Sequence, residues 1–464
     1  MSSLVAPLQK FATNSLEQHW EPFTANRAFK ADPRLIVKSE GVHLWDHKGG
    51  KIIDGSSALF NVAAGHGRRE IADAVHAQML ENDYTPHFQI GHPGSYAFAA
   101  RLAKILPEPI NHVFFVNSGS ESIDTAMKIA FAYHRARGDD RRLRLISRER
   151  AYHGVNMGGV SLAGLVKNRE QFPVTLPNVV MMRHTWLDEN RFQRGQPETG
   201  AELANDLQRF CDFYGGDTIA AVFIEPVAGS TGCLPPPKGY LERVREICDK
   251  YGILLVFDEV ITGFGRLGTP FAADYFGVVP DIMTMAKALT NGAIPMGAVA
   301  VKDDVYTTIT EAAPEGAIEF FHGYTYSAHP AAGAAGLVTL DIYEREGLLT
   351  RAAELTDYFL DGIWSLKSND VVFDLRGIGL MAGVPTLSFH QHLPHYELTE
   401  PEGDRLRVLG RQPVDPDRPH PFTAAGNTEF NAVVWMPSAG DRAGDIVLID
   451  STHFTTLFGG TDSL

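Results

Sequence analysis

The 464-residue chain has few cysteines and no long hydrophobic run. Its three cysteines, Cys211, Cys233 and Cys248, are widely spaced and form no CxxC pair, which excludes a disulfide framework and indicates a reducing compartment. No apolar run reaches the roughly 18 residues of a membrane span, and the first twenty residues lack the apolar core of a signal peptide. These absences predict a cytoplasmic protein with no membrane partner.

Basic charge is also scarce. The chain has 41 lysines and arginines against 56 aspartates and glutamates, a formal net charge of -15 at pH 7. Proteins that bind the phosphate backbone of nucleic acids need a basic face, so no nucleic-acid partner is expected. The length is sufficient for two or three domains that share a large buried core.

Short apolar runs alternate with segments of helical periodicity from Leu35 to Val384. The runs Ala220–Ile224, Ile253–Phe257 and Asp281–Met285 are typical of buried strands, and Lys238–Tyr251 has apolar residues at helical spacing. This alternation predicts an α/β fold with a mainly parallel sheet covered by helices on both faces.

Ionisable side chains follow each of these three runs. Glu225 follows the first, Asp258 and Glu259 follow the second, and Lys287 lies just beyond the third. The carboxyl ends of parallel strands meet at one edge of a sheet, so we expect these groups to lie together. Any one of them alone is more often a solvated loop charge, but their combination indicates a chemical site.

The segment Phe114–Gly138 combines an apolar run, a turn of small residues and a helical stripe. Ser118 and Glu121 form the capping box that begins a helix, and Gly119 and Ser120 lie in its first turn. Free N–H groups and the helix dipole at such a start favour an anion, although a plain helix cap is the alternative. No Walker lysine follows, so a nucleoside triphosphate is not expected.

Three further residues could hold and activate a flat heterocycle. Tyr152, beside His153, could stack on a ring, although ordinary packing is commoner. Asp258 could pair with a pyridinium nitrogen, an interaction of roughly 4 kcal/mol at about 4 Å and an effective dielectric near 20, and so make the ring an electron sink. Lys287 could become a nucleophilic amine through desolvation; a snorkelling lysine is the alternative.

Two other patterns are weaker. Gly263–Gly268 fits GxGxxG, but Pro270 follows at once and no amphipathic helix opens there, so a dinucleotide site is not predicted. His390, His392 and His395 lack a carboxylate cluster, so no metal site is predicted.

In combination, the motifs resemble one family. From about Trp20 to Val384 the chain is similar to the class III (ω-amino acid) aminotransferases of fold type I, which use pyridoxal 5′-phosphate (PLP), and most of all to the β-alanine–pyruvate and ω-amino acid–pyruvate transaminases. The motifs are WEPFTANRAFK at Trp20, AAGHGRREI at Ala63, FQIGHP at Phe88, NSGSES at Asn117, YHG at Tyr152, EPVAGSTG at Glu225, FDEVITGFGRLG at Phe257, MAKALTNGAIPMGAV at Met285 and HGYTYSAHP at His322.

The resemblance implies a large domain with a mainly parallel seven-stranded sheet flanked by helices, and a smaller α+β domain. Residues 1–60 would contribute to the small domain, and residues 61–325 would form the large PLP-binding domain. Residues 326–384 would begin the C-terminal part of the small domain.

The resemblance also implies residue roles. Lys287 would bind PLP as a Schiff base and move a proton between substrate and cofactor, which is worth about 10²–10⁴ in rate. Asp258 would pair with the pyridine nitrogen, and Tyr152 would stack on the ring. Other cofactor contacts would come from Gly119 and Ser120 at the phosphate, and from His153, Glu225, Val260 and Thr325. Thr325 would reach the phosphate of a neighbouring subunit, which implies a homodimer and leaves a tetramer open.

The implied reaction moves an amino group from an ω-amino acid or amine to pyruvate in two half-reactions. Phe23, Phe60, Phe88, Tyr152 and Ala228 would line the substrate pocket. Phe60 stands where similar enzymes often have Trp, which would widen that pocket. The alternatives are a diamine or biotin-precursor transaminase, an aminomutase, or a catalytically impaired product.

The family pattern ends after Val384. Prolines interrupt residues 385–464, where only Glu429–Trp435 and Asp445–Ile449 are strand-like. The family's C-terminal part ordinarily supplies an arginine for the substrate carboxylate, but Arg442 lies at a different offset and is not assigned this role. We expect a frameshifted or substituted C-terminus that leaves the cofactor site intact and weakens keto-acid binding.

Overall fold

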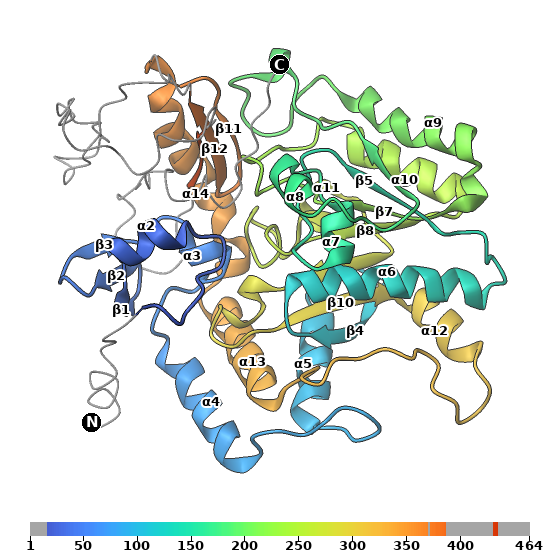
Figure 1. Cartoon of the computed structure of the whole chain (residues 1–464), viewed down its shortest axis with the longest axis horizontal. Coiled ribbons are helices and arrows are strands. Elements are labelled where there is room, and N and C mark those ends of the chain that lie inside the picture. The colour runs from blue at the N-terminus through green and yellow to red at the C-terminus, as the bar shows by residue number, and fades with distance from the viewer. Residues whose placement is uncertain (1–15, 370–371, 387–429, 435–464) are drawn as a thin grey trace.

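The computed structural model describes residues 16–369, 372–386 and 430–434 (Figure 1). The strands are β1 (Ile36–Glu40), β2 (His43–Asp46), β3 (Lys51–Ile53), β4 (Ile110–Val116), β5 (Arg144–Arg148), β6 (Val179–Met182), β7 (Ile219–Ile224), β8 (Leu254–Asp258), β9 (Ile282–Met285), β10 (Gly297–Lys302), β11 (Arg376–Ile378), β12 (Met381–Thr386) and β13 (Phe430–Val434). They form one sheet of seven strands and two sheets of three strands.

The α-helices are α2 (Asn26–Ala31), α3 (Ser57–Phe60), α4 (Arg69–Glu81), α5 (Pro93–Ala103), α6 (Gly119–Ala136), α7 (Met157–Leu162), α8 (Val166–Gln171), α9 (Asn205–Tyr214), α10 (Tyr240–Tyr251), α11 (Ala272–Phe276), α12 (Asp303–Glu311), α13 (Pro330–Arg345) and α14 (Leu348–Trp364). Short 3₁₀ turns are η1 (Asp188–Asn190), η2 (Ala201–Ala204), η3 (Gly216–Thr218), η4 (Lys287–Thr290) and η5 (Ser365–Ser368).

The seven-stranded sheet has the order β4-β10-β9-β8-β7-β5-β6. Only β10 runs antiparallel to its neighbours; β9, β8, β7, β5 and β6 pair in parallel. The prediction of a mainly parallel sheet is therefore confirmed. The three apolar runs singled out in the sequence are β7, β8 and β9, and the helical segment between the first two is α10.

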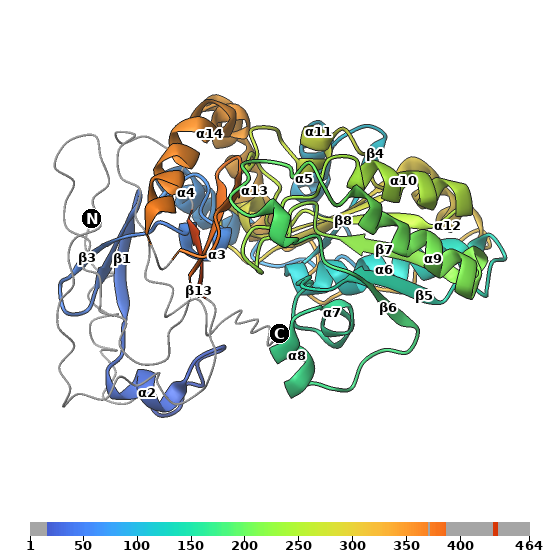
Figure 2. The ribbon, with the colours of Figure 1, turned by 90° about the horizontal axis from the view of Figure 1, so that it is seen from above.

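Alternate side chains of the central strands enter two different cores. In β7, Val222 and Ile224 pack in a cluster with residues of α9 and α10, whereas Ala221 and Phe223 pack in a cluster with residues of α6. All six residues of β7 are buried, so the strand reads as a continuous apolar run and not as an alternating one. Figures 1 and 2 show the two helical layers on opposite faces of the sheet.

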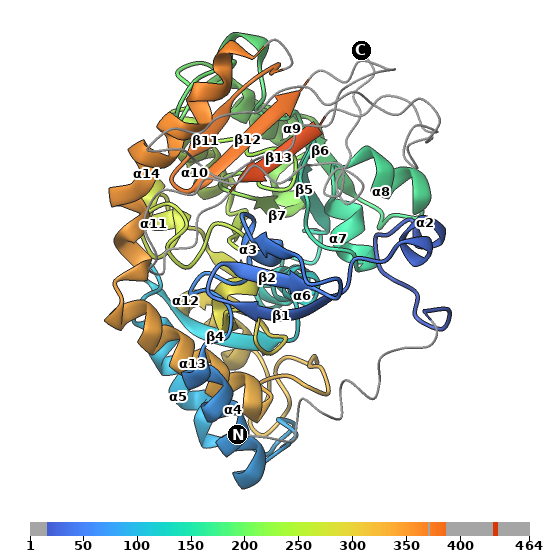
Figure 3. The ribbon, with the colours of Figure 1, turned by 90° about the vertical axis from the view of Figure 1, so that its left-hand side faces the viewer.

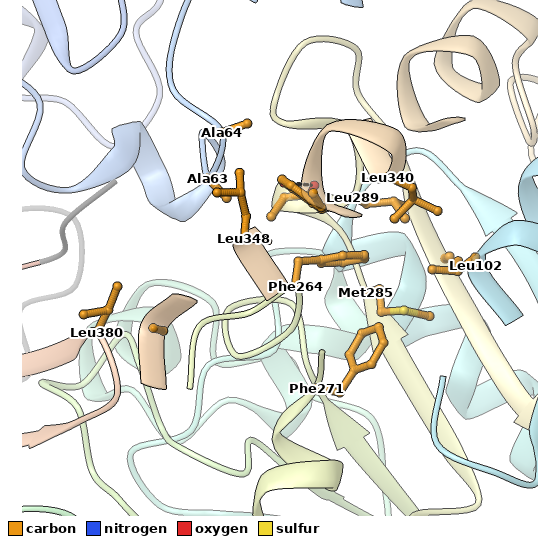
Figure 4. Close-up of a cluster of buried hydrophobic side chains, with 14 of the residues drawn as sticks. Ala63, Ala64, Leu102, Phe264, Phe271, Met285, Leu289, Leu340, Leu348 and Leu380 are labelled. Atoms are coloured by element: carbon orange, nitrogen blue, oxygen red, sulfur yellow. Dashed lines mark hydrogen bonds between the residues drawn. The ribbon is translucent and has the colours of Figure 1, made fainter. Parts of the chain in front are cut away.

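A third core joins the sheet to the C-terminal helices. Figure 4 shows residues of this cluster drawn from several elements, among them Leu102 of α5, Met285 of β9, Leu340 of α13 and Leu348 of α14. The cluster includes Leu289, two residues beyond Lys287. The end of β9 and the turn that carries Lys287 are therefore packed on three helices.

The two small sheets lie on the same side of the large one (Figures 2 and 3). Both are antiparallel, in the orders β1-β2-β3 and β11-β12-β13. Strand β13 confirms the expectation of a strand within Glu429–Trp435. No helix of the described residues is long and apolar enough to cross a membrane.

Several predictions fall outside the described residues. These are the strand-like run Asp445–Ile449, Arg442, and the histidines His390, His392 and His395. The boundaries proposed for the domains, and the frameshifted or substituted origin of residues 385–464, stay predictions.

Candidate active site

Three segments that follow strands meet at the carboxyl edge of the large sheet. Gly119 begins α6 after β4, Val260 follows β8, and Ala286 follows β9. A Cβ placed on Gly119 would lie 3.1 Å from Cγ1 of Val260 and 3.7 Å from Cβ of Ala286. The helix start, the Asp258 segment and the Lys287 segment are thus in contact, as the sequence predicted.

The start of α6 can receive an anion. The hydroxyl oxygen of Ser118 accepts the N–H of Glu121 at 3.2 Å, as a capping residue should. The carboxylate of Glu121 returns to the N–H of Asn117 at 2.8 Å, one residue before the position expected for a capping box. The hydroxyl oxygen of Ser120 accepts the N–H of Val155 at 3.0 Å, so its own proton can be donated to a ligand.

Asp258, the last residue of β8, is paired with a fully buried histidine. Its Oδ2 lies 2.8 Å from Nδ1 of His153, and its Oδ1 accepts the N–H of Val260 at 3.1 Å. Because Nδ1 faces a carboxylate, it carries the proton and donates it. Nε2 of His153 makes no hydrogen bond within the described part of the chain. The pair fixes the direction of the Asp258 carboxylate.

Glu225 holds the main chain around Tyr152. Its two carboxylate oxygens accept the N–H groups of Tyr152 at 2.9 Å and Gly229 at 3.1 Å. Burial raises the pKa of Glu225. Burial, and then the carboxylates of Asp258 and Glu225, raise the pKa of the Tyr152 phenol to about 12. The phenol is therefore protonated and neutral near pH 7.

Lys287 lies two residues beyond β9 with a φ of 48°, in the left-handed region that is unusual for a lysine. Two hydrogen bonds hold its segment: the hydroxyl of Ser122 donates to the carbonyl of Met285 at 3.1 Å, and that of Tyr343 donates to the carbonyl of Ala288 at 2.7 Å. The amine nitrogen lies 5.2 Å from the centre of the Phe60 ring.

The amine of Lys287 loses its proton easily. Burial, with a smaller contribution from the nearby charge of Arg266, lowers its pKa, the carboxylates of Asp258 and Glu225 act in the opposite direction, and the net pKa is about 8. Near pH 8 a large share of this amine is neutral. A neutral amine is a nucleophile and can accept a proton.

The predicted substrate residues fall into two groups. Phe60 and Ala228 are buried, and Phe60 faces the amine of Lys287. Phe23 and Phe88 are exposed, with 44% and 57% of their surface accessible.

Thr325 is also exposed and lies on the same surface as Phe88. The hydroxyl of Tyr84 donates to the Thr325 carbonyl at 2.8 Å, and a Cβ placed on Gly323 would lie 2.7 Å from the Phe88 ring. We call residues 84–90 and 320–326 the exposed loop pair.

Glu259 differs from the expectation that it would join the site. Its carboxylate accepts the N–H groups of Ala272 at 3.0 Å and Ala273 at 2.8 Å, together with the hydroxyl of Thr262. It therefore caps the start of α11. Asp258 ends β8 beside His153, whereas Glu259, just beyond the strand, reaches the start of α11, so the two neighbouring acids serve different purposes.

Sequence reasoning missed Arg266, whose charge acts on the amine, and Asn291, whose side chain binds the main chain of Ala64 and Gly65. Arg266 lies in the glycine-rich turn Gly263–Gly268, which predicts no dinucleotide site because no amphipathic helix follows it, and Asn291 lies in the turn after Lys287. Arg266 is buried and donates to the Phe60 carbonyl at 3.2 Å. An arginine within an otherwise apolar, glycine-rich turn is the sequence signal that could have identified it.

Comparison with known proteins agrees with this geometry. The aminotransferase class-III family profile matches residues 25–400. The chain belongs to the class III aminotransferases. An omega-aminotransferase of Caulobacter vibrioides is 50% identical over 406 residues, which cover 86% of this chain and 92% of that protein. A beta-alanine–pyruvate aminotransferase of Pseudomonas aeruginosa is 50% identical over 372 residues, which cover 80% and 83%.

The solved structures lead to the same family. An amine transaminase from an uncultivated Pseudomonas species, in its PLP-bound form, superposes with a TM-score of 0.76 at 35% identity, covering 81% of this chain and 86% of that one. Class III aminotransferases depend on PLP, so PLP is the cofactor of this aminotransferase. The groups at the sheet edge fit it: a helix start suits its phosphate, a buried carboxylate its ring nitrogen, and a partly neutral amine its aldehyde.

Proposed function

We propose that this aminotransferase transfers the amino group of an ω-amino acid or amine to pyruvate, with Lys287 as the residue that bonds to PLP and moves the proton. The observation that carries the proposal is the contact of the Gly119 helix start with the segments of Asp258 and Lys287. The names of the two relatives that are 50% identical support the substrate class.

The residues around Lys287 would divide the work of holding the cofactor. Gly119 and Ser120 would bind the phosphate. Asp258, oriented by His153, would pair with the ring nitrogen, and Tyr152 would stack on the ring. Glu225 would keep Tyr152 in place, and Val260 would pack beside the helix start. When bound, PLP supplies an aldehyde that takes up the amine and a ring that withdraws electrons from the reacting carbon.

Lys287 would be the acid and base of the reaction. With a pKa of about 8, its amine can take the proton from the substrate carbon and return it in the reverse direction, which is worth about 10²–10⁴ in rate. The face of the Phe60 ring would favour the ammonium form through a cation–π contact. Phe60 and Ala228 would also limit the size of the group that the pocket accepts.

We propose in addition that two copies of the chain complete the site. Thr325 would donate its hydroxyl to the phosphate in the partner's site, and Phe88 and Phe23 would line the pocket from across the interface. Several large apolar side chains around the exposed loop pair are open to solvent: Phe88, Ile90, Tyr96, Phe321 and Tyr326. Such a gathering of exposed apolar groups is typical of an interaction surface. A cytoplasmic location stays a prediction.

The test is spectroscopy and product analysis of the purified protein with PLP. β-Alanine and the two enantiomers of 1-phenylethylamine would each be offered with pyruvate, and alanine and the keto product measured. We expect alanine formation from β-alanine and from one enantiomer. Transfer only from diamines would replace the substrate assignment, an isomerised amino acid would indicate an aminomutase, and failure to take up PLP would indicate an impaired product.

A further inference from the structure

The segment that carries Phe60 has an unusual backbone. Ser57, Ala58 and Phe60 have φ values of 54°, 57° and 65°, the left-handed region that residues with a side chain rarely adopt. Such conformations persist only where surrounding contacts determine them, and they concentrate at functional sites. The contacts that hold this segment therefore help to decide where the Phe60 ring lies.

Besides the Ser56 hydroxyl, which donates to the Ala58 carbonyl at 2.8 Å, three polar side chains hold this segment or the residues just after it. Both carboxylate oxygens of Asp54 accept the N–H of Ala58, at 2.9 and 2.7 Å. The side chain of Asn291, four residues after Lys287, accepts from the N–H of Ala64 at 2.8 Å and donates to the Gly65 carbonyl at 3.0 Å. The third is Arg266. Among these three side chains, only that of Arg266 binds the main chain of Phe60 itself.

Arg266 is well placed to hold that carbonyl. Its guanidinium donates to the Phe60 carbonyl at 3.2 Å and lies 3.5 Å from the Ile261 carbonyl, while its own carbonyl accepts the N–H of Leu380 at 3.1 Å. Two glycines on either side pack the turn on α14, because a Cβ on Gly265 or Gly268 would come within 2.6 Å of that helix's main chain. Both the main chain and the guanidinium of Arg266 are therefore held by neighbouring segments.

We propose that Arg266 is a positioning residue of this transaminase: it ties the strained Phe60 segment to the turn after β8 and so keeps the Phe60 ring against the amine of Lys287. This inference rests on the proposed function. It adds a residue that acts through Phe60 and Lys287 without touching the substrate.

Arg266 would act on Lys287 by two routes that substitutions can separate. Its positive charge lowers the pKa of the amine, against the carboxylates of Asp258 and Glu225. Its hydrogen bond places the ring whose face favours the ammonium form. R266K retains the charge and weakens the tie, whereas R266M removes both.

The first experiment is a double-mutant cycle between Arg266 and Phe60 in the PLP-loaded enzyme. The readout is the ratio of kcat/KM for 1-phenylethylamine to kcat/KM for β-alanine. This ratio depends on the position of the Phe60 ring, because Phe60 would limit the size of the group that the pocket accepts. We expect R266M to change the ratio by about fivefold or more in the parent enzyme and by less than about twofold in F60A, because coupled residues are not additive. R266K should change it in the same direction.

Arg142 offers a matched control. It is also an arginine that holds main-chain carbonyls, those of Ile219 at 3.0 Å and Tyr251 at 2.9 Å, but it does so at the opposite end of the sheet. R142M should leave the ratio unchanged. Equal effects of R266M in the parent and F60A backgrounds, or no effect in either, would overturn the proposal.

A second experiment does not depend on turnover. Competitive labelling of the cofactor-free protein across a pH series, read by mass spectrometry of the Lys287 peptide, gives the titration midpoint of that amine. R266K should lower the midpoint, because it keeps the charge but loosens the ring that favours the ammonium form. R266M loosens the ring equally and also removes the like charge, so its midpoint should lie above that of R266K. A parent-like midpoint in R266K, or equal midpoints in the two variants, would contradict the proposal. If the parent enzyme transfers no amine, the proposed function fails, while this titration still decides the role of Arg266.

Discussion

The buried surroundings of Lys287 and the exposed loop pair differ in how completely one chain builds them. Around Lys287, strand ends, a helix start and five polar side chains are already connected by hydrogen bonds within the described chain. Thr325 and Phe88, by contrast, lie on the surface. In the proposed function these are two halves of one site: a buried half around Lys287 that the sheet holds, and an exposed half at the loop pair that would act against a second copy.

The largest effect should come from the centre of the buried half. We expect K287A to reduce transamination by at least about 10⁴-fold, because it removes the acid and base and the bond to PLP at once. Initial rates with β-alanine and pyruvate, and cofactor retained after gel filtration, measure this. K104A, which removes an exposed lysine, is the control and should behave as the parent. Retained activity in K287A would refute the assignment of the buried half-site.

The next effect separates two neighbouring acids, of which only Asp258 belongs to that half. D258N keeps an acceptor for His153 but removes the charge opposite the ring nitrogen. We expect it to lower the transamination rate by about 10³-fold, which corresponds to the loss of an interaction of roughly 4 kcal/mol. E259Q should leave the rate within about threefold and lower the melting temperature instead, since it disturbs the cap of α11. Equal losses of rate in the two variants would mean that the division between them is wrong.

A smaller effect should come from the exposed half. T325A would remove one charge-assisted hydrogen bond, so the Kd for PLP should rise by about 10- to 100-fold. Equilibrium titration of cofactor absorbance measures it.

Mixing the T325A and K287A proteins sharpens this test. A hybrid dimer would pair Lys287 of one subunit with Thr325 of the partner subunit, giving one intact site. At a PLP concentration between the two Kd values, activity should therefore rise on mixing. No rise would mean that Thr325 acts within its own chain or not at the cofactor.

The smallest effect concerns the pH dependence of stability. Burial raises the pKa of Glu259 to about 7, above its ordinary value of 4.5, despite hydrogen bonds that favour the charged form. The protonated acid is thus favoured in the folded state, so its contribution is complete below pH 4.5 and is lost as the pH rises through about 7. Melting curves from about pH 4.5 to pH 8 should decline more steeply for the parent than for E259Q. Parallel curves would count against this assignment.

The sequence was most informative where local patterns coincide with tertiary position. Apolar runs located β7, β8 and β9, and the carboxyl-end rule then brought Asp258 and Lys287 to one edge. The Ser118 cap located the helix start that meets them. Each of these features depends on a few consecutive residues, so a single chain reveals it.

The sequence was least informative where the decisive contact joins distant residues through main-chain atoms. Arg266 and the Phe60 carbonyl are separated by 206 positions, and a carbonyl has no residue type to identify it. The sequence groups Glu259 with Asp258 because both follow one apolar run, whereas the Glu259 carboxylate binds main-chain N–H groups of Ala272 and Ala273, thirteen or more positions away. The left-handed conformations at Ser57, Ala58 and Phe60 also lack the glycine that would have marked them.

The pairing of β13 with β12 has a consequence for shortened versions of this protein. Five positions of β12, from Ala382 to Thr386, face positions of β13 from Val434 to Phe430. A chain cut after Thr386 would leave that side of β12 with unpaired N–H and C=O groups, a ready template for intermolecular strand addition. Whatever the origin of the C-terminal residues, removing them to improve expression would replace an intramolecular strand pair with an exposed edge strand that favours aggregation.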